Sequence, residues 1–246
     1  MNTILKINNI TMKFGELLAN EDVSFDIKEK EIVSLIGPNG AGKTTLFNCI
    51  SGFYAPSSGK VEYQNHDITG KTSDVICRLG ITRTFQIVKT LNEMTVEQNI
   101  MTGAFLHTNR TSVAREETEK VLEMTGLSNK KEMLGRNLTI VDRKRVEIAR
   151  ALATKPKILM LDECMAGLNQ TEIKDVMDLV VRLKGQGLTL LIVEHIMEAI
   201  MPISDRIVVL NAGKKIAEGK PNEIAENEEV IKAYLGEKYH AKSKKH

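Results

Sequence analysis

The sequence predicts an α/β fold built around a mostly parallel β-sheet. Short, continuous apolar runs such as Ile158–Leu161 and Leu188–Val193 have the length and composition of strands that are buried on both faces. Between them, Gln170–Lys184 has apolar residues every three or four positions, the spacing of an amphipathic helix. Apolar strands that alternate with helices are typical of a parallel sheet covered by helices.

Local patterns predict the other elements. Alternating apolar and polar residues indicate half-buried strands at Ile4–Ile10 and Val23–Ile27, whereas Glu31–Ile36 has the more continuous apolar pattern of a buried strand. A helical composition extends over much of the middle of the chain. In chain order, these elements are strands at Ile4–Ile10, Val23–Ile27 and Glu31–Ile36, a helix at Lys43–Ser51, a strand at Lys60–Tyr63, a mainly helical segment at about 97–134, and strands at Arg206–Leu210 and Lys215–Glu218.

Size and composition restrict the class of protein. The 246 residues suffice for one α/β domain or two small ones, and 42% hydrophobic and 27% charged residues are ordinary for a soluble globular protein. The net charge of +2, from 34 basic and 32 acidic residues, gives no reason to expect a nucleic-acid partner. We expect no membrane span, no secretory signal, reduced cysteines in a cytosolic setting, and a frayed basic tail at Lys238–His246.

The clearest functional motif is GPNGAGKT at Gly37–Thr44, which fits G-x-x-x-x-G-K-[ST] between a predicted strand and helix. Glycines allow positive φ and close backbone approach, so that successive N–H groups converge on phosphates. We expect Lys43 to reach the β- and γ-phosphates, Thr44 to bind Mg²⁺ through its hydroxyl, and Thr45 to donate to an α-phosphate oxygen. The predicted nucleotide-binding residues here are Asn39, Gly40, Ala41, Gly42, Lys43, Thr44 and Thr45.

Two acidic residues follow the buried strand KILMLD. Asp162 emerges at the carboxyl end of this strand, where ligands bind in open parallel sheets. We expect Asp162 to hold Mg²⁺ through water, and Glu163 to polarise the attacking water as a general base. The alternative is a pair of solvated acids at a strand end, which the phosphate loop in the same chain disfavours.

Phe14, Gln86 and His195 are weak candidates when each is taken alone. A phenylalanine in KFGE is compatible with a core position, and Gln86 in TFQ is compatible with a surface amide. A single histidine after a strand is more often structural. His195, however, follows the strand that should neighbour the Asp162 strand, near the γ-phosphate, so these residues gain weight as a set with the phosphate loop.

Together, these motifs resemble the ATP-binding subunits of ABC transporters, over nearly the whole chain and in the family's order. The resemblance implies a P-loop ATPase core with a mostly parallel sheet, a small antiparallel β subdomain and an inserted helical subdomain. It implies a single ATP-binding cassette over 1–246, with the core at 1–86 and 155–246, the helical insert at about 87–154 and the basic tail at 238–246.

The resemblance also implies roles for individual residues, with ATP and Mg²⁺ bound at the site. Phe14 matches the aromatic residue that stacks on adenine in the family. The implied catalytic residues are Glu163, His195 and Gln86, and the implied Mg²⁺ ligands are Thr44, Gln86 and Asp162.

More narrowly, the chain is similar to the ATPase subunits of branched-chain amino-acid importers. The similarity rests on AGLN after the two acids, VEHIM around His195, and the closing runs AEGKPNEI and VIKAYLG. It implies ATP hydrolysis that drives uptake of branched-chain amino acids or a similar small polar solute. The implied partners are a second ATPase subunit, two integral-membrane permease subunits and, indirectly, an extracytoplasmic substrate-binding protein, with the chain peripheral at the cytoplasmic face of the inner membrane.

One segment departs from the family pattern. The family signature Leu-Ser-Gly-Gly-Gln aligns here with LTIVD, in which Ile140 and Val141 replace both glycines and Asp142 replaces glutamine. β-Branched residues resist positive φ and crowd an anion, and Asp142 adds negative charge near the phosphates. The substitutions predict a weaker nucleotide site on this side of a dimer, unless the segment donates its N–H groups with negative φ.

The intact phosphate loop beside an altered signature predicts an asymmetric pair, in which a different chain supplies a glycine signature. A regulatory or weakly active ABC protein that is not coupled to amino-acid transport is the alternative that LTIVD supports. A soluble ABC protein that acts on DNA repair or ribosomes is disfavoured, since the chain carries one cassette and a charge of only +2.

Overall fold

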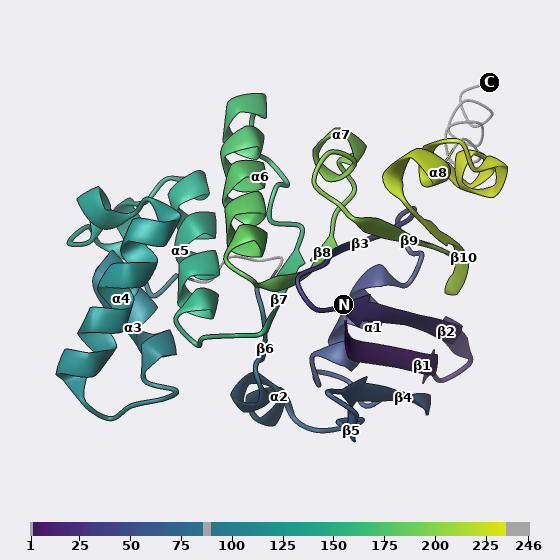
Figure 1. Cartoon of the computed structure of the whole chain (residues 1–246), viewed down its shortest axis with the longest axis horizontal. Helices are drawn as coiled ribbons and strands as arrows, with labels where there is room; N and C mark the ends of the chain where they lie inside the picture. The colour runs from purple at the N-terminus through teal and green to yellow at the C-terminus, as the bar shows by residue number, and fades with distance from the viewer. Residues whose placement is uncertain (1, 86–89, 235–246) are drawn as a thin grey trace.

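A six-stranded sheet in the order β10-β9-β3-β8-β7-β6 forms the centre of the computed structural model, which describes residues 2–85 and 90–234 (Figure 1). Neighbouring strands pair in parallel except β9 and β10, which are antiparallel. This confirms the mostly parallel sheet. In spatial order the strands are β10 (Lys214–Gly219), β9 (Arg206–Asn211), β3 (Ile32–Ile36), β8 (Thr189–Val193), β7 (Ile158–Asp162) and β6 (Ile81–Arg83).

Burial on both faces explains the continuous apolar runs of the central strands. Every residue of β3, β7 and β8 is buried. Alternate residues of β7 enter different hydrophobic cores: Ile158 and Met160 pack on the side of helix α1 (Lys43–Ile50), while Leu159 and Leu161 pack on the opposite side. In a strand that is covered on both faces, no side chain faces solvent, so apolar and polar residues do not alternate along its sequence.

A second sheet, antiparallel and in the order β2-β1-β4-β5, covers the side on which α1 lies (Figure 1). Its long strands β1 and β2 have a buried face and a solvated face, which agrees with the alternation seen in the sequence. The strands are β1 (Thr3–Phe14), β2 (Leu17–Lys28), β4 (Ser58–Tyr63) and β5 (His66–Asp67). The first three are longer than the predicted segments, and the two-residue β5 was not predicted.

Helices cover the other face of the central sheet. Helices α3 (Val96–Ala104), α4 (Thr111–Thr125) and α5 (Ile140–Leu152) pack together and share a core with α6 (Gln170–Gly185) and the central strands (Figure 1). The division of the chain into a core and a helical insert stays a prediction. In the part of the chain that is described, no helix has both the length and the apolar character needed to cross a membrane.

Several short elements were not predicted, because one or two turns of helix carry little periodic signal. Strand β6 was missed for the same reason, since it has only three residues. The basic tail at 238–246 and Gln86 lie outside the described residues. All three cysteines are free thiols. The unpredicted helices are α2 (Ser73–Leu79), α7 (Met197–Ile200) and α8 (Pro221–Ala225), with 3₁₀ turns at Ser128–Lys130 and Gly135–Asn137.

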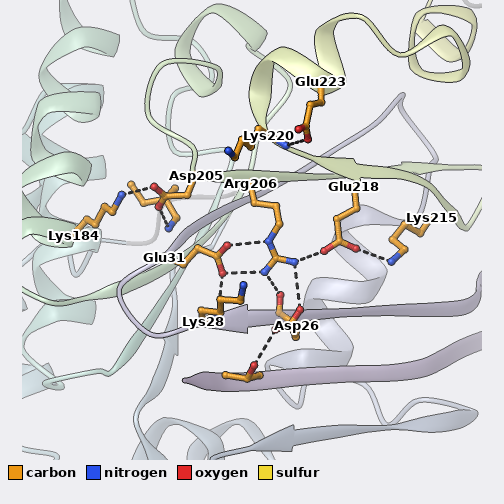
Figure 2. A network of polar contacts seen from close by, with 12 residues as sticks. Asp26, Lys28, Glu31, Lys184, Asp205, Arg206, Lys215, Glu218, Lys220 and Glu223 are labelled. Carbon is orange, nitrogen blue, oxygen red and sulfur yellow. Dashed lines mark hydrogen bonds and ion pairs between the residues drawn. The ribbon is translucent and has the colours of Figure 1, made fainter. Parts of the chain in front are cut away.

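One arginine joins the two sheets (Figure 2). Arg206, at the start of β9, donates from Nε and Nη2 to both carboxylate oxygens of Glu31, each at 2.9 Å. The same guanidinium bonds the backbone carbonyl of Asp26 on β2 at 2.6 Å and the carboxylate of Glu218 on β10. Hydrogen bonding to Glu31 is the main cause of a raised pKa of Arg206, so the guanidinium stays charged.

We predict that Arg206→Ala lowers the free energy of unfolding by about 2–4 kcal/mol, because it leaves the nearly buried Glu31 carboxylate without its partner. Urea unfolding followed by circular dichroism measures the change. Lys232→Ala is the matched control, because Lys232 pairs with Glu228 on an exposed surface and such pairs contribute less than about 1 kcal/mol. Equal unfolding midpoints for the two variants would contradict a structural role for Arg206.

Candidate functional site

Three strand ends bring the predicted site residues to one edge of the central sheet. Strand β8 pairs with both of its neighbours, with Val193 opposite Leu35 of β3 and also opposite Asp162 of β7. The loops that follow β3, β7 and β8 therefore leave the sheet side by side. The phosphate loop, Glu163 and His195 stand on these loops, at the edge where open parallel sheets bind ligands.

Backbone crowding explains the glycines of the phosphate loop. Gly42 caps helix α1 with φ of 94°, and a Cβ there would lie 2.4 Å from the carbonyl oxygen of Ala19 and 2.5 Å from Nδ2 of Asn20. A Cβ on Gly37 would lie 2.1 Å from the carbonyl oxygen of Leu210. Both contacts are far shorter than van der Waals distance, so only glycine fits at these positions.

The side chain of Lys43 folds back onto the phosphate loop. Its side chain is buried, and Nζ donates to the carbonyl oxygens of Gly37 at 2.7 Å and Pro38 at 2.9 Å. Helix α1 begins at this lysine and has no acidic residue in its first turn. A helix N-terminus and an ammonium group within one loop form a site suited to an anion.

A cavity of about 610 Å³ is lined by all of the predicted nucleotide-binding residues. Its size falls within the range of about 300–1,000 Å³ usual for small-molecule sites. Phe14 lies at its margin, half exposed, with its ring edge-on to Tyr54 at 5.3 Å between centroids. The lining comprises Phe14, Leu17, Leu18, Ala19, Asn39, Gly40, Ala41, Gly42, Lys43, Thr44, Thr45, Glu163, Ala212 and Gly213.

A groove of about 680 Å³ elsewhere, between α4 and the start of β8, contains none of the phosphate-loop residues. The larger volume alone does not make it the functional site. The 610 Å³ cavity has the phosphate-binding chemistry, so we regard it as the candidate site.

Asp162 has two carboxylate oxygens in different environments. Oδ2 accepts from Nη2 of Arg83 at 3.2 Å, whereas Oδ1 is buried and has no hydrogen-bond partner within residues 2–85 and 90–234. Burial raises the pKa of Asp162, and the charge of Arg83 opposes that rise. A buried carboxylate oxygen without a donor fits a Mg²⁺ ion with water in its shell, since Mg²⁺ is usually held by one or two carboxylates and substrate phosphates.

Glu163 turns the chain out of the sheet in a strained conformation. Its φ is 47°, and its backbone N–H donates to the carbonyl oxygen of Val193 at 2.9 Å. Such a φ is uncommon for a residue other than glycine and is often found at functional sites. The turn brings Glu163 into the lining of the cavity beside the phosphate loop.

His195 is on the expected edge but outside the cavity lining. Its side chain is 50% exposed, and Nδ1 lies 4.0 Å from Oε2 of Glu194. Glu194 is fully buried and accepts the backbone N–H of Met165 at 2.7 Å. Burial is the main cause of a raised pKa of Glu194. Gln86, the other predicted catalytic residue on a loop, lies outside the described residues.

The LTIVD segment forms the first turn of helix α5. Thr139 is the N-cap, and its hydroxyl oxygen accepts the backbone N–H of Asp142 at 3.2 Å. Ile140 and Val141 have helical rather than positive φ, so the expected conflict between β-branching and backbone conformation is absent at these two positions. Of the two possibilities, the structure has N–H groups presented with negative φ.

Asp142 also differs from expectation. Its side chain is turned into the protein, 6% exposed, and pairs with Nζ of Lys130 at 2.7 Å while accepting from Oγ1 of Thr139 at 2.8 Å. Burial acts to raise the pKa of Asp142, but hydrogen bonds from Lys130 and Thr139 lower it overall. The expectation that Asp142 adds negative charge near the phosphates is therefore wrong, because Lys130 neutralises this carboxylate. The difference from the family signature that still affects the surface is the side chain of Ile140, which is 66% exposed.

Charged residues near the site were missed by sequence reasoning. Nζ of Lys144 on α5 donates to the carbonyl oxygens of Ala166 at 2.6 Å and Glu163 at 3.3 Å. Oε1 of Glu147, one turn later, accepts the backbone N–H of Phe85 at 2.8 Å. In a sequence, such charges on a helix are indistinguishable from a solvated face. Arg83 was missed because no motif contains it.

Comparisons with known proteins agree with this geometry. The model of the ABC transporter family matches residues 20–166, and the model of branched-chain amino acid ATP-binding cassette transporters matches residues 214–240. The high-affinity branched-chain amino acid transport ATP-binding protein LivG of Salmonella typhimurium is 43% identical, with 95% of this chain and 98% of LivG covered. BraF of Pseudomonas aeruginosa, which has the same description, is 42% identical with the same coverage.

Solved structures give the same picture. A nucleotide-free ATP-binding cassette from an ABC transporter superposes with a TM-score of 0.87 at 33% identity, covering 95% of this chain and 99% of that one. An ATP-binding cassette in its ADP conformation superposes with a TM-score of 0.88 at 33% identity, covering 96% and 100%.

We predict that Lys43→Ala weakens the binding of a labelled ATP analogue by about 100-fold, because it removes charge-assisted hydrogen bonds to the phosphates. Fluorescence titration of the full chain measures the dissociation constant. Lys60→Ala, on an exposed part of β4, is the matched control and should bind like the wild type. An unaltered dissociation constant for Lys43→Ala would remove this loop from nucleotide binding.

Proposed function

The chain belongs to the ABC transporter family as an ATP-binding subunit, and on this basis we propose that it powers uptake of branched-chain amino acids or a similar small polar solute. The observation that carries the proposal is the single cavity shared by Phe14, the phosphate loop and Glu163. The branched-chain amino acid transport function named for its 42–43% identical relatives supports the choice of substrate.

The cavity supports a specific mode of ATP binding. The adenine would stack on Phe14, which is half exposed at the cavity margin. The phosphates would lie at the N-terminus of α1, where Lys43 exchanges its bonds to two loop carbonyls for bonds to the β- and γ-phosphates. Thr45 would donate its hydroxyl to an α-phosphate oxygen.

We propose that Thr44, Asp162 and Gln86 hold Mg²⁺ at this site. When bound, the ion neutralises charge on the β- and γ-phosphates. The arrangement of Asp162 supports this assignment, because Oδ1 is buried and free to accept from a water molecule while Oδ2 is engaged by Arg83.

Glu163 is proposed as the general base. It lines the cavity beside the phosphate loop, which supports a carboxylate that would lie near the γ-phosphate and the attacking water. The carboxylate would accept the proton of that water as the bond from its oxygen to the γ-phosphorus forms and the bond from phosphorus to the bridging oxygen breaks, so that ADP leaves. His195 and Gln86 are proposed to contact the γ-phosphate and the attacking water. His195 follows strand β8, which pairs with β7.

The proposed setting is a transporter in which the chain is peripheral at the cytoplasmic face of the inner membrane. Two integral-membrane permease subunits would bind it there, and an extracytoplasmic substrate-binding protein would act indirectly through them. A second ATPase chain with a glycine signature would complete the nucleotide site that contains Lys43 and Glu163.

The proposed asymmetry between the two ATPase subunits depends more on the side chain of Ile140 than on the backbone of the LTIVD segment. The N-terminus of α5 presents its N–H groups in the helical conformation, and Asp142 is neutralised. Ile140 is the exposed branched apolar side chain at this helix end, where it would meet the phosphates of a nucleotide bound to the partner subunit. This obstacle also favours the second candidate, a weakly active regulatory subunit that is not coupled to amino-acid transport.

We predict that Glu163→Gln retains ATP binding and lowers hydrolysis by about 10²–10⁴-fold, the usual cost of losing a general base. Phosphate release from the assembled transporter, and uptake of labelled leucine, isoleucine and valine into proteoliposomes, measure the two activities. Both should fall together. Hydrolysis without uptake of any of these amino acids in the wild-type assembly would favour the regulatory candidate.

We predict that the isolated chain is a weak ATPase and that a partner subunit with a glycine signature raises its turnover. Ile140→Ala should raise the rate of the isolated chain by about 10-fold, because the smaller side chain no longer blocks access of phosphate to the backbone N–H donors at the start of α5. Val141→Ala, at a half-buried neighbouring position, is the control. If the wild-type chain alone turns over as fast as the full assembly, the asymmetric pair is the wrong description.

A further inference from the structure

Arg83 is held between two aromatic rings beside the candidate site. It is the last residue of β6, and its side chain is only 11% exposed. Its guanidinium carbon lies 4.9 Å from the ring centroid of Phe47 and 4.8 Å from that of Phe85. Stacking of this kind restricts the plane of the guanidinium group. Burial lowers the pKa of Arg83, and the charges of Asp162 and Glu147 oppose that shift.

Hydrogen bonds fix the remaining freedom of this group. Nε donates to the carbonyl oxygen of Thr84 at 3.2 Å. Nη1 donates to Oδ1 of Asn48 on α1 and to Oγ of Ser51, the C-cap of the same helix, at 3.0 Å. Nη2 is thereby directed at Oδ2 of Asp162, 3.2 Å away. A lysine could not make these contacts simultaneously, since it has a single donor atom without the planar fork.

This arrangement determines which oxygen of Asp162 is available. The carboxylate is 1% exposed, so bulk solvent does not reach it. With Oδ2 bound to Arg83, the only oxygen left for another donor is Oδ1, which is buried and has no partner in the described part of the chain.

The same contacts extend to the helix that carries Thr44, another of the proposed Mg²⁺ ligands. Thr44 and Asn48 are four residues apart on α1, so they lie on one face of that helix. Arg83 binds Asn48 with one nitrogen and Asp162 with another. A single guanidinium group therefore connects the helix that carries Thr44 to the carboxylate of Asp162.

We propose that Arg83 is a positioning residue that orients Asp162 toward Mg²⁺ and sets its distance from Thr44. The inference rests on the proposed Mg²⁺–ATP site. Residues that orient a metal-binding carboxylate typically change metal affinity by about 10–100-fold when they are altered. An arginine that only stabilised the fold would leave the Mg²⁺ requirement unchanged.

The test is the Mg²⁺ dependence of nucleotide binding by the full chain, without any turnover. A fluorescent ATP analogue is titrated into wild type and Arg83→Lys, first with EDTA and then at increasing Mg²⁺ concentration. We expect binding in EDTA to be unchanged, and the Mg²⁺ concentration for half-maximal enhancement of binding to rise about 10-fold. Electron paramagnetic resonance of Mn²⁺ in the presence of nucleotide reports the same change at the metal itself.

The matched control is Arg206→Lys. Arg206 is also a nearly buried arginine bound to carboxylates, but it lies in the network that joins the two sheets (Figure 2). We expect this variant to lose stability and keep the wild-type Mg²⁺ dependence. If Arg83→Lys and Arg206→Lys lower the melting temperature alike and neither shifts the Mg²⁺ dependence, Arg83 is structural and the inference is overturned.

If Arg83→Lys does not fold, a second variant still tests the inference. Asn48→Ala removes an anchor of Arg83 on α1 and leaves both Arg83 and Asp162 in place. We expect a smaller shift in the same direction, and an unchanged Mg²⁺ dependence in this folded variant would also overturn the inference. A wild-type chain that binds nucleotide with no effect of Mg²⁺ would instead overturn the proposed function on which the inference rests.

Discussion

The burial of a charged carboxylate at the end of β7 is the constraint on which the organisation of the site depends. Asp162 is 1% exposed, and an isolated buried charge is unfavourable unless it is paired and hydrogen-bonded. Arg83 supplies that pairing through Oδ2. Arg83 is itself removed from water and needs its own compensation, which Phe47, Phe85 and Asn48 provide. Holding one carboxylate therefore ties β6, β7 and α1 together around the place where Mg²⁺ and the phosphates are proposed to bind.

Helix α5 connects this centre to the altered signature. Lys144 donates to the backbone carbonyls of Glu163 and Ala166, and Glu147 accepts the backbone N–H of Phe85, which immediately precedes Gln86 in the chain. Helix α5 thus forms one packed unit with the backbone at Glu163 and at Phe85. The replacement of both signature glycines leaves this unit intact, because the segment is helical and needs no positive φ. The proposed asymmetry accordingly reduces to a single exposed side chain, Ile140, at the helix end.

Patterns within a few residues were sufficient to predict the phosphate loop and the strand that ends at Asp162. A phosphate loop requires glycines and a lysine at fixed spacing, because only those residues give its backbone curvature and charge, and crowding at Gly42 bears this out. A strand covered on both faces requires an apolar run, as in β7. The meaning of LTIVD was harder to predict, since it depended on whether φ at Ile140 was positive and on what surrounded Asp142.

The sequence by itself therefore determined the fold class, the phosphate loop and the strand-end acids, because each depends on local chain geometry and on the period of its apolar residues. Only the tertiary structure decided that Arg83 holds Asp162 and that Lys130 neutralises Asp142. These partners are 79 and 12 residues apart in the chain. Neither pair has a spacing that a sequence pattern could reveal, because the packing of separate elements brings their charges together and burial then makes each pairing necessary.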